Sequence, residues 1–125
     1  MKFNQFQVWV DTWVQQCFGS LKALTTRERS FRFIEEGVEL VQATGLTKEE
    51  VIRVVEHVYA KPVGQVEQEA GGVLMSMTVL CNHLGINMAN TAQGALHECI
   101  ANGAKIRAKL EQKKLVGISE GDPTL

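Results

Sequence analysis

Residues 33–41 read FIEEGVELV and combine three carboxylates with an apolar helical repeat. The apolar residues recur every three or four positions, so on a helix they form one stripe that faces a core. Glu35, Glu36 and Glu39 lie beside that stripe at helical spacings, where like charges repel by about 0.2–0.5 kcal/mol per pair. A divalent cation with oxygen ligands is the simplest reason for such a cluster to persist. The segment therefore predicts both a helix and a cation site.

The same helical periodicity runs through most of the chain, while alternating strand-like patterns are scarce. Gly19, Gly45 and Gly85 stand where helices are expected to end. Residues 47–50, TKEE, are typical of a capping box that opens the third helix. Gly94 and Gly103 each weaken the last helix by about 1 kcal/mol relative to Ala, so we expect it to bend or break. The patterns predict an all-α bundle of four or five helices, over about residues 4–18, 26–44, 47–60, 66–83 and 87–114.

The predicted fourth helix is strongly apolar, since residues 73–81 read VLMSMTVLC. A helix that is apolar nearly all round must be covered on most sides, and a small domain has few other helices to cover it. We therefore expect a homo-oligomer that shares this helix. We also expect residues 1–116 to form a single domain and residues 117–125, which are polar and contain Gly and Pro, to be a disordered tail.

The composition limits the partners and the location. The 125 residues suit one domain with its own core. Thirteen basic and fourteen acidic residues give a net charge of -1, which offers no general reason to expect binding to nucleic acid or to a membrane. We expect neither a membrane span nor a signal peptide, because no apolar run is long enough. The three cysteines are odd in number and far apart, so a reducing cytoplasm is the simplest setting.

A second acidic feature, Glu67 and Glu69, opens the predicted fourth helix. One interpretation is that both are ordinary charges of a helix N-terminus, where the helix dipole favours them. Another is that Glu69 faces the first acidic cluster, because two antiparallel helices that both carry carboxylates can make a Mg2+ site. Gly71 and Gly72, which follow, indicate either close helix packing or room for a ligand.

Basic residues flank the acidic motif. Arg29 and Arg32 precede it on the second helix, and Lys105 and Arg107 lie on the last one. A solvated helix face explains most such residues, but one or two within reach of the carboxylates could bind a phosphate. The first helix carries aromatic residues near helical spacing, namely Trp9, Trp13 and Phe18. Such residues are typical of a core and would stack a nucleobase if they line a cleft.

The order of these motifs resembles the MazG-like, all-α nucleoside triphosphate pyrophosphohydrolases. That family carries Glu-Glu-x-x-Glu on one helix and Glu-x-x-Asp on the next, and residues 35–39 match the first motif. The similarity covers roughly residues 6–110 and points to a phage and bacterial branch. It rests on the segments WVQQCFG (13–19), ERSFRFIEE (28–36), LVQA (40–43), VYAKPVG (58–64), EAGGV (69–73) and IRAK (106–109).

The resemblance implies a hydrolase that cuts a nucleoside triphosphate between its α- and β-phosphates and releases a monophosphate and pyrophosphate. It implies Mg2+, with Mn2+ as an alternative, between the phosphates and the carboxylates. Family members are usually dimers or tetramers, so it also implies a homodimer or homotetramer. The site residues that it implies are Glu36, Glu39 and Glu69 as metal ligands, Glu35 as a further ligand or the base that orients the water, and Lys105, Arg107, Arg29 and Arg32 as phosphate contacts.

One position departs from the family pattern. Gly72 stands where the family has the Asp of its second motif, so one direct metal ligand is missing there. The matched branch shares this Gly-Gly-Val form, and Glu67 or a water held by Ser76 could fill the gap. Two other interpretations stay open: a catalytically degenerate member that binds nucleotides or a protein partner, and a purely structural helical oligomer with an incidental acidic patch.

Overall fold

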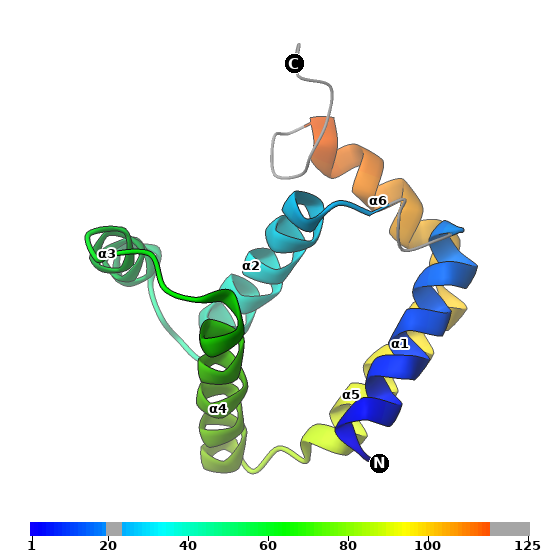
Figure 1. The fold of residues 1–125 in the computed structure, drawn as a ribbon, viewed down its shortest axis with the longest axis horizontal. Coiled ribbons are helices and arrows are strands. Elements are labelled where there is room, and N and C mark those ends of the chain that lie inside the picture. Colours follow the sequence, from blue (N-terminus) through cyan, green and yellow to red (C-terminus); the bar gives the residue numbers. More distant parts are fainter. Residues whose placement is uncertain (20–23, 116–125) are drawn as a thin grey trace. The chain divides into compact units, whose positions relative to one another are not determined.

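The computed structural model describes residues 1–19 and 24–115, which form six helices and no strand (Figure 1). The helices are α1 (Phe3–Phe18), α2 (Thr26–Ala43), α3 (Lys48–Tyr59), α4 (Val66–Leu84), α5 (Met88–Ala101) and α6 (Gly103–Leu115). The predicted all-α class is confirmed, but the described residues form six helices where four or five were expected. The predicted disordered tail, residues 117–125, lies outside the described residues.

The sixth helix arises because the last predicted helix is divided. The break falls at Asn102, directly before Gly103, which begins α6, whereas Gly94 stays inside α5. The side chain of Asn102 donates a hydrogen bond to the carbonyl of Glu98 at 2.8 Å. A Cβ atom on Gly103 would lie 3.5 Å from the sulfur of Cys17. That is an ordinary van der Waals distance, so the start of α6 packs against the end of α1.

The chain groups into two compact units. Unit 1 consists of Met1–Glu35 and Ala89–Leu125, and unit 2 consists of Glu36–Met88. The boundary falls inside α2, between the first two glutamates of the acidic motif. The expectation of a single domain over residues 1–116 stays a prediction.

Unit 1 is held together by contacts between α1 and the pair α5 and α6 (Figure 1). The indole nitrogen of Trp13 donates to the carbonyl of Cys99 at 3.2 Å. Val14 and Cys17 are buried on the same side of α1. The rings of Trp13 and Phe18 meet edge to face, with centroids 5.9 Å apart. Most of the predicted aromatic stripe of the first helix thus serves as packing.

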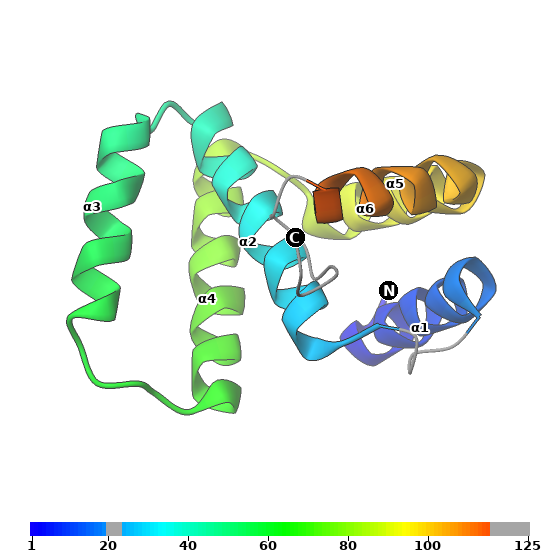
Figure 2. The same ribbon diagram turned by 90° about the horizontal axis from the view of Figure 1, so that it is seen from above.

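Unit 2 contains α3, α4 and the end of α2 (Figure 2). The predicted capping box at α3 is confirmed, because the Thr47 hydroxyl accepts from the Glu50 N–H at 3.2 Å and the Glu50 carboxylate accepts from the Thr47 N–H at 2.8 Å. Gly85 ends α4 with a φ of 71°, and the Ile86 N–H bonds to the Cys81 carbonyl at 2.9 Å. That pair is a Schellman motif, which glycine favours.

Unit 2 buries little of its apolar surface. Among its described residues Cys81 is buried, whereas Leu74, Met75 and Val79 of α4 are 51%, 68% and 63% exposed. These side chains belong to the helix that was predicted to need cover on most sides. In the single chain, the apolar surface of α4 is therefore left open.

No described helix is by itself long and apolar enough to cross a membrane. Helices α4 and α5 meet the length and composition criteria only as a broken pair, and core helices often meet them as well.

Candidate functional site

The acidic motif lies in the second half of α2. The helix starts with a capping interaction, because the hydroxyl of Thr25 accepts a hydrogen bond from the Glu28 N–H at 3.1 Å. It ends at Gly45, whose φ of 106° allows the Leu46 N–H to reach the Val41 carbonyl at 3.0 Å. Local hydrogen bonds therefore set both ends of the helix that carries the glutamates.

Glu35, the first glutamate of the motif, is paired with two cations in unit 1. One carboxylate oxygen accepts from the guanidinium of Arg32 at 2.8 Å, and the other accepts from the ammonium of Lys113 in α6. The hydrogen bond from Lys113 lowers the pKa of Glu35 below its ordinary value of 4.5; the charges of Lys113 and Arg32 act in the same direction, against an opposing effect of burial. Both oxygens of this candidate ligand are thus engaged by the chain itself.

Glu28 anchors the basic residues that precede the motif. Its side chain is 5% exposed and lies 3.3 Å from the guanidinium nitrogens of both Arg29 and Arg32. Arg29 also lies over the ring of Phe18 at 5.9 Å. The two arginines predicted as phosphate contacts therefore have structural partners in unit 1. The sequence analysis missed Glu28, although its spacing of four residues from Arg32 is a typical signal for a helical ion pair.

Glu36 and Glu39 lie on the unit 2 part of α2 and are both exposed. Three residues separate them, so their side chains are neighbours on the helix surface. Among the described residues, neither carboxylate is paired with a cation. Two adjacent oxygen donors without a counter-charge fit the ligand preference of Mg2+, which takes one or two carboxylates together with waters and phosphates. The donor chemistry of this pair therefore suits the metal that the sequence implies.

Glu69 lies in the first turn of α4, as predicted. Its carboxylate folds back over Gly64 in the preceding loop, so closely that a Cβ atom on Gly64 would collide with one of the carboxylate oxygens. A hydrogen bond of 2.9 Å from the Glu69 N–H to the Gln65 carbonyl fixes the backbone at this point. The absence of a side chain at position 64 therefore creates the space in which this carboxylate lies.

Gly71 and Gly72 have open space around them, since no atom would lie within 4 Å of a Cβ at either position. The alternative of close helix packing is therefore not seen at these glycines in the single chain. The space beside Gly72 is compatible with a ligand or a bound water, which was the other interpretation.

The basic residues of α6 differ from each other in their surroundings. Arg107 donates to the Cys17 carbonyl at 2.9 Å and so caps the end of α1. Lys105 is exposed. Lys113, which the sequence analysis did not consider, contacts the first glutamate of the acidic motif. No local pattern could have shown this, because 78 residues separate it from Glu35.

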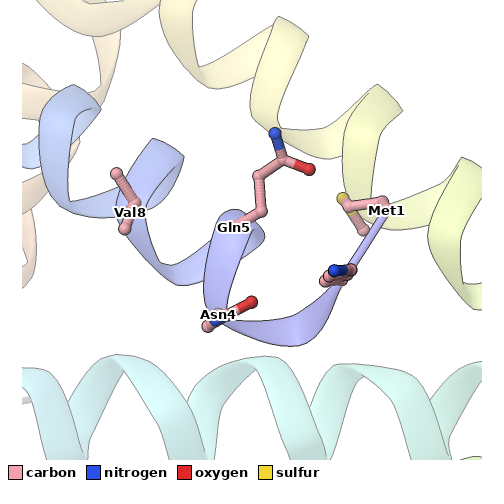
Figure 3. Close-up of a pocket in the computed structure, with 5 residues that line it drawn as sticks. Met1, Asn4, Gln5 and Val8 are labelled. Carbon is pink, nitrogen blue, oxygen red and sulfur yellow. The ribbon is translucent and has the colours of Figure 1, made fainter.

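Two of the hollows in unit 1 have none of these carboxylates among their lining residues. One is a depression at the start of α1, around Met1, Asn4, Gln5 and Val8 (Figure 3). The other is a groove of about 360 Å3 between α1 and α5. Its walls combine aromatic, amide and apolar side chains, which are Trp9, Thr12, Trp13, Gln16, Gln93, Leu96, His97 and Ile100. Such a mixture suits a planar ring with polar edges, as expected for the aromatic residues if they line a cleft.

Within residues 1–19 and 24–115, no three His, Cys, Asp or Glu side chains are grouped so that they could hold one metal ion. The structure pairs Glu36 with Glu39 by helix geometry and ties Glu35 to cations. Comparison of the chain with models of protein families, with curated proteins and with solved structures gives no match.

Proposed function

We propose that the chain is a Mg2+-dependent nucleoside triphosphate pyrophosphohydrolase of the MazG-like kind, which cuts between the α- and β-phosphates. The observation that carries the proposal is the pair Glu36 and Glu39, exposed side by side on α2 without a counter-charge among the described residues. Without a ligand such a pair is only repulsive. A cation bound together with substrate phosphates would turn the repulsion into attraction.

In this proposal Glu36, Glu39 and Glu69 hold the metal, and Gly64 leaves room for the carboxylate of Glu69. When bound, Mg2+ would neutralise phosphate charge and lower the pKa of the attacking water. Glu35 accepts a proton from that water or orients it. Mn2+ has similar ligand preferences and is the alternative metal.

In this proposal the basic residues bind the phosphates. The contacts that each residue makes in this structure indicate how easily it can be recruited to a phosphate. Lys105 is exposed and carries no structural hydrogen bond among those described. Arg107 would have to give up its contact with the end of α1, and Arg29 and Arg32 their contacts with buried Glu28. Lys105 is therefore the basic residue of the predicted set that is most easily recruited to a phosphate.

A second candidate function is a catalytically degenerate member of the same fold that binds nucleotides or a protein partner without hydrolysis. Gly72 is the observation that favours it. No side chain at this position can supply the carboxylate that the second family motif has there, and only open space lies around it. Such a protein would keep the contacts with the phosphates but would not hydrolyse the nucleotide.

We further propose that the protein is a cytoplasmic homodimer or homotetramer that binds no nucleic acid and no membrane. The exposed apolar side chains of α4 support self-association, because a second copy would remove them from water. The described cysteines, Cys17, Cys81 and Cys99, are all free thiols, which is what a reducing compartment favours. Sedimentation equilibrium of the wild type and of a Val79→Glu variant tests this, since a charge at a shared apolar contact should shift the assembly toward the monomer.

Pyrophosphate release from a panel of canonical and damaged nucleoside triphosphates, with and without Mg2+, tests the enzymatic proposal. We expect turnover that needs Mg2+ and that is lost in Glu39→Gln. The matched control is Glu56→Gln on exposed α3, which should keep the wild-type rate. If no nucleotide is turned over and wild type and Glu39→Gln are equally inert, the proposal fails. Mg2+-dependent binding of a non-hydrolysable triphosphate without any turnover would instead select the degenerate member.

A further inference from the structure

The groove between α1 and α5 is formed by residues of unit 1 alone. Its volume of about 360 Å3 lies within the range of about 300–1,000 Å3 that is usual for sites of small molecules. Helix α1 contributes Trp9, Thr12, Trp13 and Gln16, and helix α5 contributes Gln93, Leu96, His97 and Ile100. Because every lining residue lies on a helix and none on a loop, the walls of the groove are preformed.

The wall on α1 carries two aromatic rings. Trp9 and Trp13 are four residues apart and are therefore neighbours on the helix surface. The indole nitrogen of Trp13 donates to the Cys99 carbonyl at 3.2 Å, and its ring meets that of Phe18 edge to face, so two contacts orient the ring. Trp9 is 38% exposed, which leaves part of its surface open to a ligand. A planar ring that stacks on this wall meets a surface that is already in place.

Amide groups supply the polar part of the lining. Within residues 1–19 and 24–115, the side chains of Gln16 and Gln93 make no hydrogen bond to the protein. The Thr12 hydroxyl, by contrast, donates to the Val8 carbonyl at 2.9 Å. A primary amide has two N–H donors and an acceptor oxygen, so it complements both the ring nitrogens and the exocyclic groups of a nucleobase. The two glutamines therefore suit the edge of a ring whose face lies on tryptophan.

The lining of the groove carries no permanent charge. None of its eight residues is Asp, Glu, Lys or Arg. His97 is the one lining residue that can be protonated, and it is exposed. A phosphate or carboxylate in this groove would lose hydration without meeting an opposite charge, which is unfavourable. The composition of the groove therefore favours an uncharged ligand over a nucleotide.

We propose that this groove is a binding site for an uncharged nucleoside, whose base stacks on Trp9 and Trp13 and whose polar edge pairs with Gln16 and Gln93. Binding there requires neither a phosphate nor Mg2+. The inference therefore does not rest on the proposed pyrophosphohydrolase activity, and it gives unit 1 a ligand site of its own.

The intrinsic fluorescence of the protein reports on this site, because Trp9 and Trp13 are the two tryptophans of the chain and both line the groove. The full chain is titrated with adenosine, guanosine, cytidine and uridine in the presence of a metal chelator, and in parallel with the corresponding triphosphates and Mg2+. N-acetyltryptophanamide under the same conditions corrects for absorbance and for collisional quenching. We expect saturable quenching by at least one nucleoside, because a stacked base quenches the indole.

Two variants and a matched control separate a built site from a sticky surface. Gln93→Leu keeps both tryptophans and the approximate size of the side chain but removes the amide, so the Kd for the best nucleoside should rise about tenfold, equivalent to about 1.4 kcal/mol. Trp9→Ala should raise the Kd by at least about tenfold, with Trp13 as the remaining reporter, because stacking surface is lost. Gln7→Leu, the same change as Gln93→Leu at an exposed position of α1 outside the groove, should leave the Kd within about twofold of wild type.

The nucleoside site is overturned if none of the four nucleosides quenches the wild type more than it quenches the model compound. It is also overturned if Gln93→Leu behaves like Gln7→Leu, or if only the triphosphates with Mg2+ have an effect. Emission that changes with protein concentration and not with nucleosides would show that a second copy of the chain covers the groove, and would exclude the site as well. Nucleoside binding without any pyrophosphate release would sink the proposed function alone, whereas turnover without nucleoside binding would sink this inference alone.

Discussion

The glutamates of α2 have different surroundings in unit 1 and in unit 2. In unit 1, Glu28 is buried against two arginines and Glu35 is held by an arginine and a lysine. In unit 2, Glu36 and Glu39 are exposed and have no cation among the described residues. The change occurs within one helix, between adjacent residues. Neighbours in a single acidic motif therefore have different surroundings: Glu35 is engaged by cations of the chain, and Glu36 and Glu39 are exposed.

The same chemical change, a Glu→Gln substitution, should thus have different effects in the two units. The largest effect on stability is expected for Glu28→Gln. Removing one partner of a buried ion pair leaves the other charges uncompensated and costs about 3 kcal/mol. Urea unfolding of unliganded protein measures it, with Glu56→Gln as the control. A loss below about 1 kcal/mol would mean that the arginines find other partners and that the contrast between the units is not energetic.

Glu36→Gln should have the complementary effect. We expect it to lower Mg2+-dependent turnover by about a hundredfold, because a ligand of the charge-stabilising cation is lost. Stability in the absence of metal should rise slightly, by about 0.3 kcal/mol, because repulsion from Glu39 is relieved. Turnover and urea unfolding, measured on the same preparation, test the expected fall in turnover and the expected rise in stability. An unchanged rate together with lower stability would place Glu36 with the structural carboxylates of unit 1.

The position of Glu69 can be tested without touching its charge. Gly64→Ala should force the Glu69 carboxylate aside, because the new methyl group would occupy its place. The far end of a glutamate rotates easily, so the loss of stability should be small, whereas turnover should fall about tenfold, a change of about 1.4 kcal/mol. Glu69→Gln in the Gly64→Ala background should cost little more, since both act on the same group.

Gly71→Ala is the matched control for Gly64→Ala. It adds the same methyl group where there is open space and should stabilise the helix by up to about 1 kcal/mol. Equal losses of turnover in both glycine variants would contradict a specific role for Gly64.

The local features of the fold could be predicted because their signals lie within a few residues. The capping box of Thr47 and Glu50 and the helix ends at Gly45 and Gly85 need only neighbouring backbone groups, and the structure confirms them. The sequence alone could not predict at which of the two glycines the last helix breaks. Propensity weakens the helix equally at Gly94 and Gly103, and the contact of Gly103 with Cys17 of α1 is formed only in the folded unit.

The candidate site likewise combines features that local spacing predicts with contacts that form only in the folded chain. Glu36 and Glu39 could be placed on one helix surface from their spacing alone. The pairing of Glu35 with Lys113 spans 78 residues and has no local signal. The likeness to the MazG-like family identifies which residue types matter, and it stays a prediction. It carries no information about which cations hold the motif in the empty protein, because a motif lists ligands and omits the residues that compete for them.

A smaller effect tests whether the two units unfold separately. Thr47→Ala removes the capping box of α3 and should cost about 1 kcal/mol. If unit 2 opens on its own, hydrogen exchange should speed up at amides of α3 and stay unchanged at amides of α1. If residues 1–116 form the single cooperative domain that the sequence predicts, the protection of both helices should fall by the same amount. Asn102→Ala, a polar-to-Ala change in unit 1, provides the reciprocal measurement.

The smallest expected effect is the pH dependence that Glu35 gives to unit 1. Lys113 and Arg32 lower its pKa in the folded state below the ordinary value of 4.5. Its contribution to stability is therefore fully present above pH 4.5 and is lost as the pH falls through the lowered folded-state pKa. Because the pair is partly exposed, the contribution should be below about 1 kcal/mol.

Melting temperatures of wild type and Glu35→Gln should therefore converge as the pH falls below 4.5. Lys113→Gln should remove most of the pH-dependent difference, because the hydrogen bond from Lys113 is the largest cause of the lowered pKa. A wild type that keeps its advantage over Glu35→Gln at low pH would show that the side chain contributes packing and not charge, and Glu35 would then no longer mark the point at which α2 changes from structural to ligand-accessible carboxylates.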